Sequence, residues 1–294
     1  MHMSTVHFTL TRLSAFFLAV LVAGAAKGEP LKPFKDELFS SATVLESRDG
    51  GDFEAIDYQE MRDINGRDQV PERRVKSKYV AKLKQKPVNE ALILQSGNLE
   101  VSRLGPAAGA NFTVIFIHGR GGDRRLGFND YTFGGNFNRL KNLVVENGGT
   151  YYAPSVRSFD AKGVDSVAAL VDNAAKLSPG RPVIVACASM GNFICWGLTR
   201  KPETVSQLKG MAILGGPTDP AFVGSAAHKA KLPIWFTHGS RDNVYPAPDQ
   251  IALYDKLHKA KYPVRFTLFE TGGHGTPIRM TDWRKLLNWF VTDQ

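Results

Sequence analysis

Apolar and polar positions along the chain form two alternating kinds of segment. Short runs rich in β-branched and aromatic residues predict buried strands at residues 113–117, 151–153, 182–186, 211–214, 232–236 and 264–269. Segments of helical character separate or follow these strands at residues 137–147, 164–177, 190–200, 248–261 and 281–292. Such an alternation favours the α/β class, with a mostly parallel central sheet covered by helices on both faces.

The chain before residue 113 departs from this alternation. Within residues 74–84, lysines fall on one parity and less polar residues on the other, which predicts a strand with one basic face. Residues 91–94 and 99–104 flank a Ser-Gly-Asn sequence and predict an antiparallel pair. We expect these three strands to open the sheet.

The N-terminus has the pattern of an export signal. Arg12 precedes an apolar stretch that ends in small residues, and this stretch is shorter than the ~20 residues that a membrane-spanning helix needs. We therefore expect residues 1–26 to be a secretory signal peptide, cleaved between Ala25 and Gly28, and the protein to be periplasmic or secreted, with no stable membrane span. An uncleaved N-terminal anchor is the alternative.

The remaining chain divides into two parts by composition. Residues 27–72 are polar and lack a sustained period, which predicts an irregular N-terminal arm. Residues 73–294 contain the alternating segments and are long enough to form one large domain with its own core.

One of the apolar runs ends at a serine. Residues 183–186 lead into Cys187-Ala188-Ser189-Met190-Gly191, and a helical segment follows. A serine on a sharp strand-to-helix turn presents its hydroxyl group above the sheet, and the helix N-terminus directs backbone N–H groups toward the reacting oxygen. Cys187 stands where the usual Gly-x-Ser-x-Gly pattern has its first glycine, a position that requires a small side chain. A turn without a catalytic role is the alternative interpretation.

Three other predicted strands also end in glycine-containing loops that carry a polar residue. Residues 113–117 are followed by His-Gly-Arg-Gly-Gly, which includes Arg120; residues 232–236 are followed by a loop with Asp242; and residues 264–269 are followed by a loop with His274. Along the chain the order is glycine-rich loop, serine, aspartate, histidine. In this order the sequence resembles the α/β-hydrolase superfamily over residues 75–294, and is most similar to compact, cap-less esterases and dienelactone-hydrolase-like members.

The resemblance implies an α/β-hydrolase fold and a serine hydrolase that cleaves carboxylic esters through an acyl-enzyme, without a cofactor. It assigns Ser189 as nucleophile, His274 as base and Asp242 as the residue that orients the histidine. The oxyanion would be held by the backbone N–H groups of Arg120 and Met190. A thioesterase or peptidase using the same residues, or a non-catalytic binding protein of the same fold, remains an alternative.

Other polar residues compete for these roles. Asp219 follows the strand predicted at residues 211–214 and is a second candidate for the acid. His118 and His238 also lie at strand ends, but each precedes a glycine in a pair that the family uses structurally. No spacing of histidine or cysteine typical of a metal site is present, so we expect no metal.

The lengths of two connections bear on substrate access. Only residues 215–231 connect the strands at 211–214 and 232–236, so we expect no separate lid domain. The long loop after the strand predicted at residues 113–117 carries Arg124, Phe128 and Tyr131. These residues either contact the substrate or pack within the loop.

Charge and cysteine content add two further expectations. The formal net charge is +9, and between Arg73 and Lys86 there are basic residues but no acidic ones. This stretch is either an edge strand protected by lysines or a surface that attracts an anionic substrate or surface. We expect no nucleic-acid partner, because no nucleic-acid-binding motif is present, and a small-molecule or polymer-linked ester as substrate. Cys187 and Cys195 are interpreted as small buried residues rather than as a disulfide.

Overall fold

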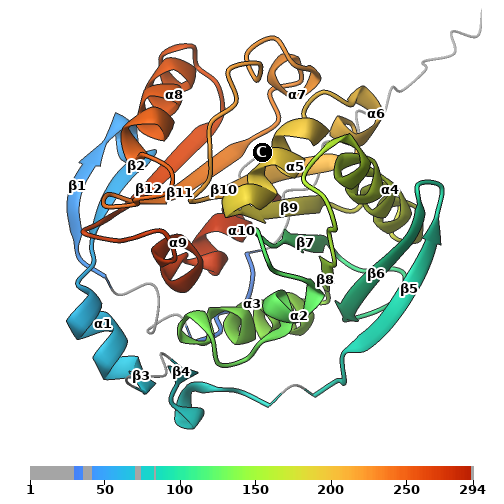
Figure 1. The fold of residues 1–294 in the computed structure, drawn as a ribbon, viewed down its shortest axis with the longest axis horizontal. Helices are drawn as coiled ribbons and strands as arrows, with labels where there is room; N and C mark the ends of the chain where they lie inside the picture. Colours follow the sequence, from blue (N-terminus) through green and yellow to red (C-terminus); the bar gives the residue numbers. More distant parts are fainter. Residues whose placement is uncertain (1–29, 36–41, 70–73, 83, 293–294) are drawn as a thin grey trace, which may run out of the picture.

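A ten-stranded sheet forms the centre of the computed structural model, which describes residues 30–35, 42–69, 74–82 and 84–292 (Figure 1). Its strands, in spatial order, are β1 (Val44–Arg48), β2 (Phe53–Asp57), β12 (Val264–Glu270), β11 (Ile234–Gly239), β10 (Leu208–Leu214), β9 (Val183–Ala188), β7 (Thr113–Ile117), β8 (Thr150–Pro154), β6 (Gly97–Leu104) and β5 (Val88–Leu94). From β2 to β8 all neighbouring strands are parallel, whereas β1, β6 and β5 pair antiparallel at the two edges. The expected mostly parallel sheet is confirmed.

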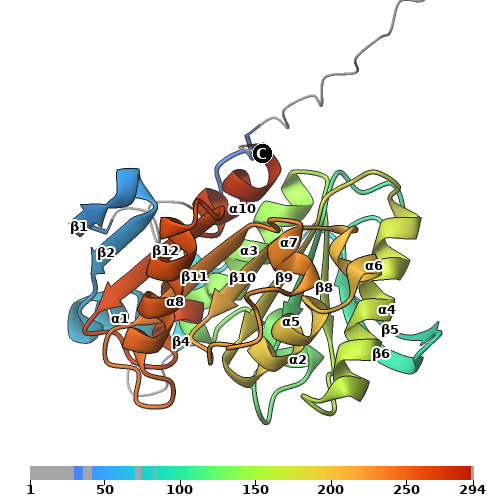
Figure 2. The same cartoon turned by 90° about the horizontal axis from the view of Figure 1, so that it is seen from above.

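Helices cover both faces of this sheet (Figure 2). One face carries α4 (Ala161–Leu177), α5 (Asn192–Leu198) and α8 (Ala247–Lys259), and the other carries α3 (Asn136–Glu146) and α10 (Trp283–Thr292). The remaining helices are shorter: α1 (Glu60–Arg67), α2 (Arg124–Phe128), α6 (Pro202–Val205), α7 (Ala226–Lys229) and α9 (Thr276–Met280). Among the described residues, no helix has the length and apolar character needed to cross a membrane.

Alternate residues of the central strands enter two separate cores. In β9, Val183, Val185 and Cys187 pack under α4 and α5, whereas Ile184 and Ala186 pack under α3 and α10. Because both faces of the strand are buried, its sequence is continuously apolar instead of alternating. This explains why the central strands could be located from apolar runs alone.

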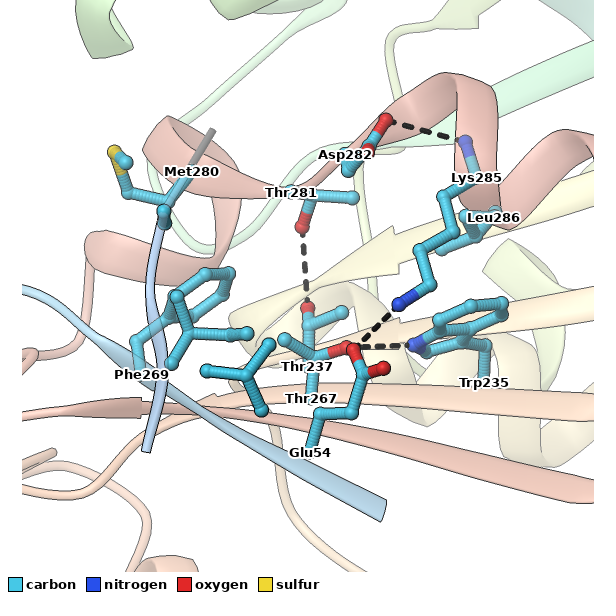
Figure 3. A pocket seen from close by; sticks show the side chains of 13 residues that line it. Glu54, Trp235, Thr237, Thr267, Phe269, Met280, Thr281, Asp282, Lys285 and Leu286 are labelled. Atoms are coloured by element: carbon cyan, nitrogen blue, oxygen red, sulfur yellow. Dashed lines mark hydrogen bonds and ion pairs between the residues drawn. The ribbon is translucent and has the colours of Figure 1, made fainter. Parts of the chain in front are cut away.

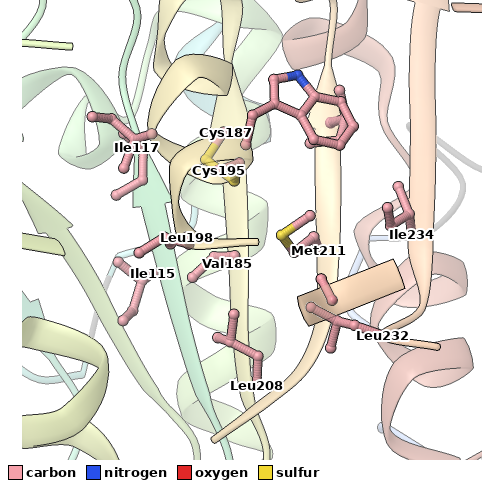
Figure 4. Close-up of a cluster of buried hydrophobic side chains, with 14 of the residues drawn as sticks. Ile115, Ile117, Val185, Cys187, Cys195, Leu198, Leu208, Met211, Leu232 and Ile234 are labelled. Carbon is pink, nitrogen blue, oxygen red and sulfur yellow. A yellow bond between two sulfur atoms is a disulfide. The ribbon is translucent and has the colours of Figure 1, made fainter. Parts of the chain in front are cut away.

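Cys187 and Cys195 form a disulfide in the first of these cores (Figure 4). Both residues are fully buried, and their Cα atoms lie 6.2 Å apart. The prediction that they are two unlinked core residues is wrong. The chain reverses direction at Ser189, so α5 packs back against the end of β9 and brings the second cysteine over the first.

The N-terminal part of the chain contributes to the sheet. The prediction of an irregular arm is wrong for residues 44–57, which form the β1–β2 hairpin, and β2 pairs parallel with β12. Phe53 and Ala55 enter the core, and Arg48 lies over the ring of Phe53 at 3.9 Å. The Asp49–Gly51 segment, which interrupts the sequence pattern, is the turn of this hairpin. The expected signal peptide lies outside the described residues.

Residues 74–82 do not form the expected basic strand. Only Arg74–Val75 is extended in a two-stranded ladder, and Ser77–Tyr79 is a short 3₁₀ helix. The backbone N–H and C=O groups of Ala81 bond to the side chain of Asn138 on α3 instead of to a strand. Of this segment only Val75 is fully buried, so its apolar side is too small to hold a strand in the sheet.

No lid domain is inserted before β11. The chain between β10 and β11 contains α7, a helix of four residues, and otherwise turns. The carboxyl ends of the parallel strands are therefore not covered by an inserted domain at this point. The candidate site lies at these carboxyl ends.

Candidate active site

Three polar side chains meet at the carboxyl ends of the parallel strands. Ser189 directly follows β9, Asp242 lies in the loop after β11, and His274 lies in the loop after β12. Parallel strands all end at the same edge of a sheet, so residues that are far apart in sequence converge there. The structure thus brings together the three residues that the sequence predicts as a site.

Ser189 occupies a strained turn. Its φ angle is +52°, a value that residues with a side chain rarely adopt, and α5 begins three residues later. The turn is packed tightly against the end of β7. A Cβ atom on Gly191 would lie 2.6 Å from the carbonyl oxygen of His118, and one on Gly119 would lie 2.8 Å from the Cβ of Ser189. Both positions therefore require glycine.

A buried asparagine holds the same turn. Asn192, the first residue of α5, donates from Nδ2 to the carbonyl oxygens of Ser189 at 2.8 Å and Leu214 at 3.4 Å. These bonds tie the serine turn to the end of the next strand, β10. The sequence analysis did not identify Asn192, because an asparagine at a helix start is common and its partners are not local.

The side chains of Asp242, His274 and Ser189 form a continuous hydrogen-bonded chain. The Nδ1 atom of His274 lies 2.8 Å from Oδ2 of Asp242, and its Nε2 lies 2.9 Å from Oγ of Ser189. With Asp242 ionised, Nδ1 must carry a proton and donate it to the carboxylate. In the neutral imidazole, Nε2 then has a lone pair directed at the serine hydroxyl group.

Asp242 is held as a buried anion. Its side chain has no exposed surface, and Oδ1 accepts hydrogen bonds from the backbone N–H groups of Val244 at 2.8 Å and Tyr245 at 3.1 Å. Burial acts to raise the pKa of Asp242, but the hydrogen bonds from His274 and the two amides outweigh it and hold the pKa below the ordinary value. The carboxylate therefore stays charged where the histidine needs it.

The rival acid is engaged elsewhere. Asp219 forms an ion pair with Arg200, the residue two positions after the end of α5, and accepts from the backbone N–H of Ala221 at 3.0 Å. It makes no contact with His274 among the described residues. Of the two candidate carboxylates, the structure brings only Asp242 to the histidine.

The other two strand-end histidines connect loops. His118 donates from Nδ1 to the carbonyl oxygen of Gly119 at 2.7 Å and accepts at Nε2 from the amide of Val156 at 3.0 Å. Burial lowers the pKa of His118, which favours the neutral ring that this pattern requires. His238 is fully buried and contacts Gln250 and the carbonyl oxygen of Tyr245, each at 2.9 Å. Neither ring reaches Ser189.

Two backbone N–H groups of the segments around Ser189 have no acceptor within the described residues. The amide of Met190 belongs to the first turn of the helix that starts at Ser189, where N–H groups lack intrahelical partners. The amide of Arg120 has no acceptor within the described part of the chain. Since Gly119 packs directly on Ser189, the loop that carries Arg120 lies against the nucleophile's turn.

The residues predicted to contact substrate lie in different surroundings. Arg124 lines an open cleft of about 790 Å³ next to the loop after β7 that carries Arg120. Phe128 packs on Tyr151, with ring centroids 5.2 Å apart, and Tyr131 lies under the guanidinium group of Arg74 at 4.6 Å. Both aromatic residues thus pack within the protein rather than line this cleft.

A second, smaller cavity of about 90 Å³ lies apart from the three side chains (Figure 3). It is enclosed by the β1–β2 hairpin, β11, β12 and the start of α10. Trp235 and Thr267 form its polar floor through a 3.0 Å hydrogen bond, and Lys285 pairs with Glu54 at its rim. None of Ser189, Asp242 and His274 lines either of these two cavities.

No cluster of three or more histidine, cysteine, aspartate or glutamate side chains suited to a metal ion is found among the described residues.

Comparisons with solved structures place the fold. A thermostable esterase matches with a TM-score of 0.55 at 18% identity, over 69% of this chain. Structures named as α/β hydrolases also match with TM-scores above 0.5, so the α/β-hydrolase fold is shown. Esterase 2 of Thermogutta terrifontis matches with a TM-score of 0.52 at 14% identity, over 72% of this chain and 97% of its own. An α/β serine hydrolase homologue from Coxiella burnetii matches with a TM-score of 0.51 at 16% identity, over 70% and 98%.

These likenesses concern the fold. The present chain spans 62% of the thermostable esterase, which is less than two thirds of that protein's length. No protein-family model and no curated protein sequence matches the chain. The activity of a protein with this fold depends on the residues of its own site.

Proposed function

We propose that the protein is a serine hydrolase that cleaves carboxylic esters through an acyl-enzyme. The observation that carries this proposal is the hydrogen-bonded chain from Asp242 through His274 to Ser189, with distances of 2.8 Å and 2.9 Å. Such a chain, with the serine on a strained turn beside two available backbone N–H groups, supplies every group that acyl transfer requires.

In the first half of the reaction, Ser189 Oγ attacks the ester carbonyl carbon while Nε2 of His274 accepts the hydroxyl proton. The charge that develops on the carbonyl oxygen is stabilised by the N–H groups of Arg120 and Met190. The tetrahedral intermediate then collapses, and His274 returns the proton to the leaving alcohol. Asp242 orients the ring and stabilises the imidazolium that exists between these two transfers.

In the second half, water replaces the serine hydroxyl group. His274 accepts a proton from the water as it attacks the acyl-enzyme, and later returns this proton to Oγ of Ser189. The carboxylic acid is released and the enzyme regenerated. No step requires a metal or a cofactor.

We also propose that this hydrolase acts in the periplasm or outside the cell. The apolar N-terminal stretch with small residues at its end supports this. The buried Cys187–Cys195 disulfide gives further support, because stable structural disulfides are typical of oxidising compartments.

Turnover of a series of p-nitrophenyl esters by the mature protein tests the proposed activity. Ser189→Ala should lower kcat by about 10⁶-fold relative to wild type. A matched control is Ser166→Ala on α4, where the hydroxyl group only bonds back to the carbonyl oxygen of Lys162. Thioester and peptide analogues measured in parallel address the alternative acyl-transfer activities. Equal ester turnover by the Ser189 variant and the control would contradict the proposal.

A further inference from the structure

The open cleft next to the oxyanion loop is rich in arginine. It lies between the segment after β7, where Arg120 is in the loop and Arg124 and Arg125 begin α2, and the loop after β8, which carries Arg157. With a volume of about 790 Å³, it is large enough for part of a small-molecule substrate. We propose that this cleft binds an anionic group, a carboxylate or a phosphate, at the far end of the acyl part of the substrate.

The charges of the cleft do not cancel. Its acidic residues are already paired: Glu100 with Arg124 at 2.8 Å, and Asp123 with Arg125 at 2.6 Å. The remaining arginines, Arg120 and Arg157, are exposed and have no ion-pair partner within the described part of the chain. Arg120 and Arg157 therefore bring to this cleft two positive charges that no carboxylate within the described residues neutralises.

Guanidinium groups suit this ligand chemistry. Their planar arrangement of N–H donors matches the oxygens of a carboxylate or a phosphate group, and can bind them through two parallel hydrogen bonds. The cleft's histidine adds no competing charge, because both ring nitrogens of His118 are occupied by backbone groups. The net charge of +9 also favours the approach of anions.

The position of the cleft in the sheet indicates that it would receive the acyl part of the substrate rather than the alcohol part. In the sheet, β7 and β8 lie on one side of β9, whereas β11 and β12, which carry Asp242 and His274, lie on the other. Nε2 of His274 must reach the leaving oxygen to protonate it, so the alcohol part lies on the histidine side. The acyl part is then the one that can extend past Arg120 into the cleft.

This inference rests on the proposed ester hydrolysis and adds a substrate class to it: esters of acids that carry a second, anionic group. It also gives Arg120 two separate tasks. Its backbone N–H would hold the oxyanion and its guanidinium group would attract the anionic group, so the carbonyl group and the anionic group would be bound by the same short loop, which borders the cleft and packs on Ser189.

The test compares two p-nitrophenyl esters of equal acyl length. One is the neutral hexanoate and the other is the adipate monoester, which ends in a carboxylate. We expect wild-type kcat/KM to favour the adipate by about tenfold, which corresponds to two charge-assisted contacts at an exposed site. This ratio should shrink when the salt concentration is raised to about 1 M, because exposed charges are then screened. An ester that ends in a phosphonate distinguishes the two kinds of anion.

Arg157→Gln should abolish most of this preference, and Arg157→Lys should retain part of it. The matched control is Arg181→Gln, since Arg181 is also exposed but lies before β9, at the opposite end of the strand from Ser189. The control should keep the wild-type ratio.

Three outcomes would overturn the inference. Wild-type protein that hydrolyses both esters equally would contradict the anion site while leaving the ester hydrolase intact. An equal loss of preference in the Arg157 and Arg181 variants would show a general charge effect rather than a site. A preference for anionic alcohols, measured with 4-carboxyphenyl hexanoate against its methyl ester, would refute the acyl assignment. Hydrolysis of neither ester would instead contradict the proposed function itself.

Discussion

Removing the cross-link between Cys187 and Cys195 should destabilise the protein by an amount that follows from the length of the loop it closes. The two cysteines are eight positions apart in the sequence. A disulfide that closes a loop of this length lowers the entropy of the unfolded chain enough to stabilise the native state by about 2.5 kcal/mol at 25 °C. For a domain of this size, the loss corresponds to a decrease in Tm of about 4–6 °C.

The effect is isolated by comparing oxidised wild-type protein with wild-type protein that is refolded and kept in reductant. The two forms have the same heavy atoms in the core and differ only in the S–S bond. Urea unfolding followed by intrinsic fluorescence gives the difference in unfolding free energy. Because the closed loop contains Ser189, we also expect the reduced form to have a lower kcat. The double variant Cys187→Ala/Cys195→Ala should be insensitive to reductant.

Thiol titration provides the decisive control for this reasoning. Unreduced wild-type protein should show no reactive thiol even when it is fully unfolded in denaturant, and two after reduction. Two reactive thiols in the unreduced, unfolded protein would refute the cross-link. Equal unfolding free energies of the oxidised and reduced forms would refute its stabilising role.

Further predictions concern the acid, the serine turn and the N-terminus. Asp242→Asn should lower kcat by about 10⁴-fold in a protein that still folds, whereas Asp219→Asn should retain most activity; the reverse result would transfer the acid role. Because the folded-state pKa of Asp242 lies below its ordinary value of 3.8, its contribution to stability is complete above that value and is lost as the pH falls through the folded pKa. The Asn variant should therefore lose less unfolding free energy than wild type below about pH 4, as measured by urea unfolding at each pH. Gly191→Ala would place a methyl group 2.6 Å from a carbonyl oxygen of the adjoining loop, and should lower the unfolding free energy by roughly 1–3 kcal/mol. N-terminal sequencing of protein from its native host should begin between Ala25 and Gly28; an intact N-terminus on membrane-bound material would favour the anchor.

The central strands were predictable because their environment leaves a local signature. In β7 every residue is buried on one face or the other, so the apolar run and the strand have the same limits, Thr113–Ile117. The other central strands and the longer helices differ from the prediction by at most three residues at either end. Ends are less certain because the last residues of an element are held by caps and neighbours rather than by the core.

The edges of the sheet were harder to predict. The β1–β2 hairpin contains Asp-Gly-Gly at its turn, a sequence that favours tight hairpins, and Phe53 and Ala55 alternate with polar residues after it. Strand β1, however, has almost no buried side chain and therefore no apolar pattern to recognise. Residues 76–82 show the converse: their lysines lie on one parity, but the segment has no partner strand among the described residues.

For the candidate site, the sequence indicated which residues lie at strand ends but not how they contact one another. The order of Ser189, Asp242 and His274 and their glycine-rich surroundings are local features. The disulfide depends on how α5 packs, and the exposure of Arg157 depends on how the β8–α4 loop packs. Neither feature has a local sequence pattern that predicts it. Their roles emerge only when neighbouring strands are placed side by side.

Covalent labelling of the serine tests the central claim most directly. A fluorophosphonate reacts with a serine whose hydroxyl group is activated by a neighbouring base, and intact-mass measurement followed by peptide mapping locates the adduct. We predict a single adduct on wild-type protein, at Ser189, and none on Ser189→Ala or on protein unfolded before labelling. An adduct on any other residue, or equal labelling of the Ser189→Ala variant, would contradict the account.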